Sequence, residues 1–312
     1  MVWLELGIFL LAFIVLVKSS QWVIDASIKV SKHLGISQLA IGFIIVSMAV
    51  SLPDLVVSVI SSLQGKPDLG IGDALGSSIA NICLVLGIVT LVKHVSVDRR
   101  HTLDSAELLL LISIVPMLIL SRGFVGRNEG LVLLVAFLFY CFFVMKEHFS
   151  LKIPDNLSKK EWRFALLELL AGLALVIVSS KFVVDNAIFF ARYLNISEAV
   201  IGLTLVSFGT TLPELVIDFT AIRRGQTALA IGDILGSTVT NLTLILGSVL
   251  IISPAQIDFG VYSLALAFIV IANSFLVYYL FKHEGIGRKQ GKIFLALYVA
   301  FIILTLTLKG PI

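Results

Sequence analysis

The chain is built from long apolar runs separated by short polar breaks. Most runs approach or exceed the roughly 20 residues that a helix needs to cross a bilayer. The strict alternation and the segments of about ten residues that are typical of transmembrane β-barrels do not occur. The pattern therefore predicts an all-α integral membrane protein with about ten transmembrane helices. Their expected bounds are 3–28, 38–63, 69–92, 104–121, 127–146, 164–190, 197–222, 228–252, 258–281 and 291–308.

Composition agrees with a membrane bundle and excludes a soluble enzyme. Hydrophobic residues make up 58% of the chain and charged residues 14%, against about 45–50% and about 25% in soluble domains. The long polar stretch "KEHFSLKIPDNLSKKEWR" divides the chain. We expect a membrane unit over 1–146, a cytoplasmic linker over 147–163 and a second membrane unit over 164–312. The net charge of +3 requires no nucleic-acid partner.

The basic residues are distributed unevenly between the two sides of the predicted bundle. If the N-terminus lies outside, sixteen lysines and arginines fall on the cytoplasmic side and five on the outer side. This positive-inside bias predicts a multi-pass protein of the cell membrane with both termini extracellular. The first apolar run lacks a basic n-region and a small-residue cleavage site, so we expect it to be a retained helix.

The two halves of the chain repeat each other at a constant offset. "VSMAVSLPDLVVSV" aligns without a gap with "VSFGTTLPELVIDF", and "IGDALGSSIAN" aligns with "IGDILGSTVTN". Pro53 and Pro213 are 160 positions apart, as are Asp54 and Glu214. Five spans per half is an odd number, so the second half must cross the membrane in the opposite sense. Inverted repeats of this kind are typical of secondary transporters, whose binding sites lie at the repeat interface near the midplane.

Each repeat places a proline and an acid inside an apolar run. A proline removes a backbone donor and frees carbonyls in the preceding turn, and such irregular backbone is tolerated only inside protein or beside a water-filled cavity. An intramembrane acid indicates a functional site. Ser51 and Thr211 precede the prolines and add hydroxyl oxygens. Carbonyl, carboxylate and hydroxyl oxygens together suit a hard cation such as Ca²⁺.

The second repeated motif adds further oxygen ligands. Ser77 and Asn81 are four residues apart, as are Ser237 and Asn241, so each pair shares a helix face. One turn earlier come Asp73 and Asp233, whose role stays open between lining the ion path, capping a helix start and lying near an aqueous mouth. Asp218 follows Glu214 by four residues, but its counterpart is Ser58, so the repeat does not support it as a ligand. Cys83 and Cys141 predict neither a disulfide framework nor a metal-thiolate site.

These motifs resemble those of the cation/Ca²⁺ exchanger superfamily, and most closely the Na⁺/Ca²⁺ exchangers of prokaryotic type. "GTTLPE" with "GDILGSTVTN" matches the second family repeat, and "AVSLPD" with "GDALGSSIAN" matches the first. The resemblance implies ten helices, of which the first and sixth slide across a rigid core. It also implies the metal ligands, which are Asp54, Glu214, the carbonyls of Val50 and Thr210, Ser51, Thr211, Ser77, Ser237, Asn81 and Asn241.

The sequence also departs from the family pattern. Val50 replaces the usual threonine and keeps only a backbone carbonyl, Ala49 replaces glycine, and Asp54 is shorter than the common glutamate. Some prokaryotic members carry Asp where this chain has Asn241. Asp73 and Asp233 stand where Asn is frequent. These departures leave the selectivity for the transported ions open.

The resemblance implies a secondary active antiporter that exports Ca²⁺ in exchange for Na⁺ by alternating access. It implies no enzyme activity and no cofactor, with Ca²⁺ and Na⁺ as substrates, the lipid bilayer as surroundings and no obligate protein partner. H⁺/Ca²⁺ exchange is the alternative, although the Gly-Asn-x-x-Glu element of that branch is absent. A passive channel fits two broken inverted helices less well. An intramembrane aspartyl protease is a remote alternative, because "GIGD" occurs but the Tyr-Asp and Pro-Ala-Leu elements do not.

Overall fold

The computed structural model describes most of both halves of the chain. It covers residues 42–96, 99–148, 163–175, 198–283 and 285–309, with isolated positions between 11 and 30 and at 161, 178 and 179. The expected first span (3–28), much of the sixth (164–190) and the linker (147–163) lie largely outside the described residues. The count of ten spans, the sliding role of the first and sixth helices and the domain division therefore stay predictions.

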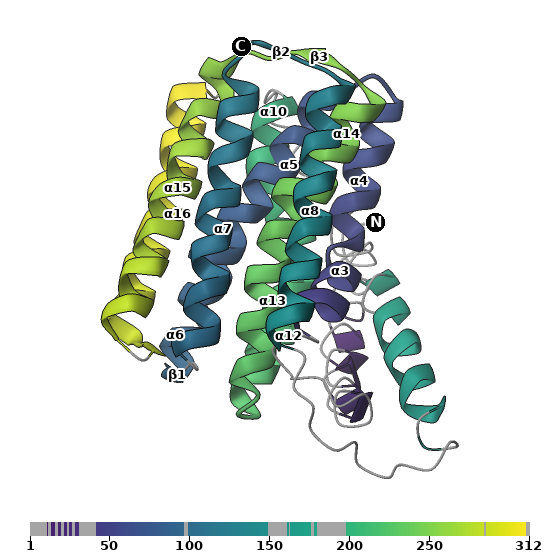
Figure 1. The fold of residues 1–312 in the computed structure, drawn as a ribbon, viewed down its shortest axis with the longest axis vertical. Coiled ribbons are helices and arrows are strands. Elements are labelled where there is room, and N and C mark those ends of the chain that lie inside the picture. Colours follow the sequence, from purple (N-terminus) through teal and green to yellow (C-terminus); the bar gives the residue numbers. More distant parts are fainter. Residues whose placement is uncertain are drawn as a thin grey trace.

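The first half consists of helices joined by short turns (Figure 1). Its elements are η1 (Gly42–Val46), α3 (Ser47–Val50), α4 (Leu52–Leu63), α5 (Pro67–Ile79), η2 (Ala80–Val85), α6 (Leu86–Val92), β1 (Val95–Ser96), α7 (Arg99–Leu120), β2 (Phe124–Val125) and α8 (Arg127–His148), where η marks a π-helical segment.

The second half repeats this order. Its elements are α10 (Glu198–Ile201), η3 (Gly202–Val206), α11 (Ser207–Thr210), α12 (Leu212–Arg223), α13 (Thr227–Thr240), η4 (Asn241–Ile245), α14 (Leu246–Ile252), β3 (Ala255–Gln256), α15 (Phe259–Lys282), β4 (Gly285–Ile286) and α16 (Arg288–Lys309). The offset of 160 residues therefore relates backbone geometry as well as sequence. The π-helical segment η3 begins and ends 160 residues after η1.

Among the described residues, six helices are long and apolar enough to cross a membrane, and two further spans are bent pairs. The segments Pro67–Val92 and Thr227–Ile252 have 26 residues each, or about 39 Å at 1.5 Å per residue. That length exceeds the roughly 30 Å of hydrocarbon in a bilayer. These eight spans coincide with eight of the expected ones, so the all-α membrane fold is confirmed.

The inverted relation of the halves is visible in two short antiparallel ladders that the sequence did not predict. β1 pairs with β4, with Val95 opposite Ile286, and β2 pairs with β3, with Phe124 opposite Gln256. β1 and β3 are repeat counterparts, yet they lie at opposite ends of the bundle (Figure 1). Each ladder therefore joins one half to the other at one membrane face, as an inverted repeat requires. Which face is cytoplasmic remains the prediction of the basic residues.

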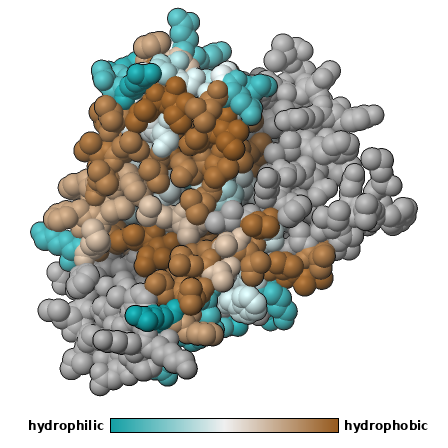
Figure 2. Space-filling view, turned by 90° about the vertical axis from the view of Figure 1, so that its right-hand side faces the viewer, coloured by the Kyte–Doolittle hydropathy of each residue, from teal (hydrophilic) through white to brown (hydrophobic). Residues whose placement is uncertain are grey.

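Two helical spans form the protein core and carry the second motif. In the most apolar stretch of Pro67–Val92 and of Thr227–Ile252, 78% and 83% of the residues are buried, against 28% in Arg127–Lys146 and in Arg288–Thr307. The exposed surface of the outer helices is apolar, and Figure 2 shows a broad hydrophobic face with hydrophilic residues toward its ends. Lipid therefore surrounds the outer helices while the motif residues are enclosed by protein.

The broken helix of each half packs directly on the core helix of the other half. η1 and α3 contact α13, and η3 and α11 contact α5. A Cβ atom placed on Gly236 would lie 2.4 Å from the Phe43 carbonyl oxygen and 2.6 Å from Ser47 Oγ. Only a residue without a side chain allows the two backbones to approach this closely. The glycines of the second motif thus hold the two motifs of opposite repeats together.

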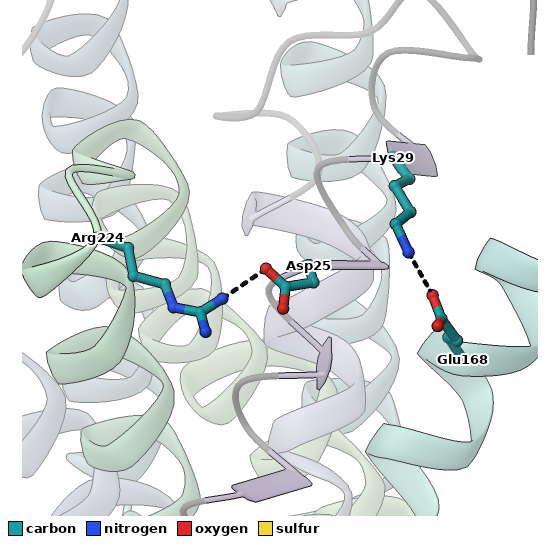
Figure 3. Close-up of polar contacts among 4 residues, drawn as sticks. All are labelled: Asp25, Lys29, Glu168 and Arg224. Atoms are coloured by element: carbon teal, nitrogen blue, oxygen red, sulfur yellow. Dashed lines mark hydrogen bonds and ion pairs between the residues drawn. The ribbon is translucent and has the colours of Figure 1, made fainter.

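Two exposed ion pairs join separate segments near one end of the molecule (Figure 3). Arg224 donates to Asp25 at 2.5 Å, and Lys29 donates to Glu168 at 2.7 Å. Arg224 follows α12, so the first pair links residues of the expected first span to the second half. The side chains are 37–52% exposed, and exposed pairs of this type contribute little to stability because water screens them.

We therefore expect a small effect when the first ion pair is removed. Arg224→Gln should lower the free energy of unfolding by less than about 1 kcal/mol, measured by thermal unfolding of the purified protein in detergent. Lys29→Gln serves as the comparison, since it removes the second pair at similar exposure. A loss of several kcal/mol in Arg224→Gln alone would mean that this contact is a structural anchor rather than a surface pair.

Candidate cation-binding site

The two motif acids begin the second part of each broken helix. In the first half, the span Gly42–Leu63 bends by 49° at Ser51, where the helix is interrupted with φ −79° and ψ 4°. Pro53 occupies the first turn of α4, a position where its missing N–H group is tolerated. Asp54 lies in the same turn, and Glu214 lies in the first turn of α12. Both carboxyl groups thus face the positive end of a helix dipole, which favours negative charge.

Hydrogen bonds connect the motif residues across the two repeats. Ser77 Oγ donates to Asp54 Oδ1 at 2.7 Å and lies 3.3 Å from Thr210 Oγ1 of the other half. Ser51 Oγ donates to Glu214 Oε1 at 3.5 Å. All five side chains are buried. The structure thus brings these five predicted residues together in two hydrogen-bonded groups, one around Asp54 and one around Glu214.

Several side-chain polar atoms of the predicted ligands have no hydrogen-bond partner among the described residues. They are Asp54 Oδ2, Glu214 Oε2 and both side-chain polar atoms of Asn81 and Asn241. All four residues are fully buried. A buried polar atom without a partner costs about 1–3 kcal/mol, so a native protein keeps such atoms for a reason. A cation that accepts oxygen lone pairs is such a reason.

The remaining predicted ligands are buried in the same region with partners of their own. Thr211 Oγ1 donates to the Ser207 carbonyl at 2.7 Å, and Ser237 Oγ donates to Asp233 Oδ1 at 3.3 Å. Val50 is buried and offers no side-chain oxygen. These contacts occupy the hydroxyl protons and leave oxygen lone pairs for a metal. Coordination by these residues and by the Val50 and Thr210 carbonyls stays a prediction.

The asparagines coincide with π-helical segments. Asn81 lies within η2 and Asn241 begins η4. A π-helical turn inserts one residue into the helix and is frequent at functional sites. The same segment recurs at the equivalent asparagine in both halves.

The structure excludes two of the three positions proposed for Asp73 and Asp233, namely the helix start and the aqueous mouth. Both are fully buried in the interior of helices α5 and α13, so neither caps a helix start nor lies at an aqueous mouth. The sequence left these positions open because it gives no direct measure of burial. Asp73 accepts from Thr210 Oγ1 and from Ser58 Oγ, each at 3.1 Å. The Asp73 carboxyl therefore positions the Thr210 hydroxyl next to Ser77.

Asp218, which the repeat does not support as a ligand, lies close to the predicted ligand Glu214. It is fully buried one turn beyond Glu214 on α12 and lies next to Asp233. The i,i+4 spacing from Glu214 places Asp218 on the same helix face as Glu214. The comparison with its counterpart Ser58 gives no support for a carboxyl group there.

The site contains five buried carboxyl groups, namely Asp54, Asp73, Glu214, Asp218 and Asp233. Every lysine, arginine and histidine whose exposure the structure describes is exposed, so no buried basic group in that part of the chain balances them. Buried carboxylates without basic partners require bound cations or protons. No group of three or more His, Cys, Asp and Glu side chains forms a metal cluster within the described ranges. The buried acids are therefore dispersed, and the candidate site combines them with neutral oxygen atoms.

A duplicated and inverted helical bundle, with buried acids at paired helix breaks, defines a secondary transporter for cations. Comparison with known proteins identifies its family. Residues 4–146 and 164–307 match the sequence profile described as sodium/calcium exchanger protein. The chain belongs to this family, and it is a multi-pass membrane antiporter of the cation/Ca²⁺ class rather than an enzyme. The protease alternative is therefore wrong.

Similar proteins extend over nearly the whole chain. An uncharacterised membrane protein from Methanocaldococcus jannaschii, MJ0091, is 34% identical over 96% of this chain and 97% of its own length. The sodium/calcium exchanger MaX1 of Methanosarcina acetivorans is 28% identical over 95% and 97%. The solved structure of the sodium-calcium exchanger NCX_Mj, soaked with 10 mM Na⁺ and zero Ca²⁺, superposes with a TM-score of 0.85 at 32% identity, covering 97% of this chain and 99% of that one.

Proposed function

We propose that this protein exports Ca²⁺ in exchange for Na⁺ by alternating access. The observation that carries the proposal is the network in which Asp54 and Glu214 each contact a hydroxyl residue at the repeat interface while retaining an unpaired oxygen. Ca²⁺ takes about 6–8 oxygen ligands from carboxylates, amides, carbonyls and water. The predicted ligands can supply that number. The exchanger names of similar proteins support both ions as substrates.

Competition for the same acids couples the two ions. Ca²⁺ and Na⁺ both require carboxylate oxygens, so occupancy by one disfavours the other, and a sodium gradient can drive calcium in the opposite direction. Inverted repeats support alternating access, because the site at their interface opens to either side as one part moves against the other.

H⁺/Ca²⁺ exchange remains the second candidate, since five buried acids without a buried basic partner can also be neutralised by protons. The two candidates are separated by calcium uptake into liposomes that contain the purified protein. We expect radiolabelled calcium to accumulate when sodium-loaded vesicles are diluted into sodium-free buffer at equal pH. Accumulation that follows only an imposed pH gradient would reject sodium coupling, and accumulation with neither gradient would reject antiport.

A further inference from the structure

Asp73 lies on the core helix α5 of the first half and reaches across the repeat interface. Thr210 Oγ1 donates to Asp73 Oδ1 at 3.1 Å, and Thr210 is the last residue of α11 in the second half. Both side chains are fully buried. The two helices pack closely, since a Cβ atom on Gly76 of α5 would lie 2.6 Å from Ser207 Oγ of α11. Asp73 thus contacts the broken helix of the other repeat at the residue where α11 ends.

The Thr210 hydroxyl has three acceptors within reach, and they differ in what they hold in place. The Val206 and Ser207 carbonyl oxygens lie at 3.0 Å and 3.3 Å. Both belong to the same broken helix as Thr210, so a bond to either leaves that helix free to shift against the other repeat. Asp73 belongs to α5, which also carries Ser77, and Ser77 Oγ lies 3.3 Å from Thr210 Oγ1. The bond to Asp73 therefore fixes Thr210 relative to Ser77.

The second copy of this arrangement lacks the equivalent contact. The repeat counterparts of Thr210 and Asp73 are Val50 and Asp233, and valine has no hydroxyl proton to donate. Asp233 accepts instead from Ser237 on its own helix, at 3.3 Å. A bond from a broken-helix hydroxyl to the core-helix acid of the opposite repeat is therefore present at Asp73 and ruled out at Asp233 by the side chain of Val50.

We propose that Asp73 is a positioning residue for the cation site, and that it acts on cation affinity through its hydrogen bond to Thr210. The inference rests on the proposed function. Each hydroxyl has one proton and two lone pairs. With the Ser77 proton directed to Asp54 and the Thr210 proton directed to Asp73, both hydroxyl oxygens keep lone pairs for a metal. Asp73 orients these ligands without contacting the cation itself.

The other contacts of Asp73 allow its oxygen atoms to be separated from its charge. Ser58 Oγ donates to Asp73 Oδ2 at 3.1 Å and lies 3.3 Å from the Gly70 carbonyl oxygen. An asparagine in place of Asp73 keeps an acceptor oxygen for Thr210, and its amide group can donate to Ser58, whose own proton then goes to Gly70. Every partner is retained although the charge is removed. A leucine of similar size offers no acceptor at all.

The proposal is tested by a double-mutant cycle on the full-length protein purified in detergent. Equilibrium binding of radiolabelled Ca²⁺ and, in parallel samples, of radiolabelled Na⁺ is measured for wild type, Asp73→Asn, Asp73→Leu, Thr210→Val and the double variant Asp73→Leu/Thr210→Val. Thr210→Val removes the hydroxyl, keeps the backbone carbonyl and installs the residue of the first half. Asp73→Ala takes the place of Asp73→Leu if leucine prevents folding. Ser58→Ala is the matched control, because it removes the other hydrogen bond to Asp73 and leaves the contact with Thr210 intact.

We expect Asp73→Leu to weaken calcium affinity about tenfold, because one buried hydrogen bond that orients the ligands is lost. Asp73→Asn and Ser58→Ala should stay within about twofold of wild type, and so should the further effect of Asp73→Leu in the Thr210→Val background, where the side chain through which Asp73 acts is absent.

Unchanged affinity in Asp73→Leu would overturn the proposal. So would an equal loss in Asp73→Asn, which would point to charge, or the full loss of Asp73→Leu persisting in the Thr210→Val background, which would point to a general effect on the fold. Wild type that binds Na⁺ but not Ca²⁺ would reject the calcium assignment, and the same cycle would then decide the role of Asp73 from sodium affinity. Wild type that binds neither cation would reject both.

Discussion

Replacing Glu214 with glutamine is expected to abolish calcium exchange. Glutamine keeps the size and one oxygen of the side chain but removes the negative charge that faces the cation. Breaking a buried charge pair by removing one partner costs about 3–5 kcal/mol, which corresponds to a loss of more than about a hundredfold in calcium affinity. The measurement is sodium-driven uptake of radiolabelled calcium in proteoliposomes, with initial rates taken over a range of calcium concentrations.

The matched control is Glu168→Gln, which makes the same chemical change at an exposed ion pair with Lys29. It should transport at the wild-type rate. Wild-type calcium affinity in Glu214→Gln, with an intact fold, would show that the cation does not depend on this carboxylate.

A methyl group added at Gly236 is expected to disrupt the contact between the repeats. The new Cβ would lie 2.4 Å from the Phe43 carbonyl oxygen, which is a backbone atom and not the end of a flexible side chain. Overpacking of this type costs about 1–3 kcal/mol. Gly236→Ala should therefore lower the melting temperature in detergent and reduce exchange, because η1 and α3 would be pushed away from α13.

Gly126→Ala is the control for this change, since its nearest neighbour to an added Cβ is Glu129 Oε2 at 3.5 Å, an ordinary contact. It should match wild type in melting temperature and exchange. If Gly236→Ala also matched wild type, the close approach of the two backbones would not be required for the site.

Duplication supplies information about space, so the sequence could predict which motif residues lie near each other. A residue and its counterpart 160 positions later must occupy equivalent places, so the proximity of Asp54, Ser77 and Thr210 followed from the repeat and the inverted topology. The eight described spans followed from the length of the apolar runs, which the bilayer constrains strongly.

The sequence could not settle positions that depend on burial or on a difference between the two halves. Asp73 and Asp233 were assigned several positions, because a helix interior and a helix start look alike in an apolar stretch. Asp218 was not supported as a ligand because its counterpart is a serine, and the sequence could not show that its carboxyl group is buried. The ladders at Val95 and Phe124 contain two residues per strand, too few to produce an alternating pattern.

The central claim is that Asp54 and Glu214 together hold the transported calcium at the interface of the two repeats. The most direct measurement is the anomalous diffraction of crystals soaked with Ca²⁺ or its heavier analogue Sr²⁺. The account predicts a peak between the two carboxyl groups, with oxygens of both within the roughly 2.3–2.6 Å typical of calcium ligands. A peak coordinated by neither residue, or located only at Asp218 and Asp233, would contradict it.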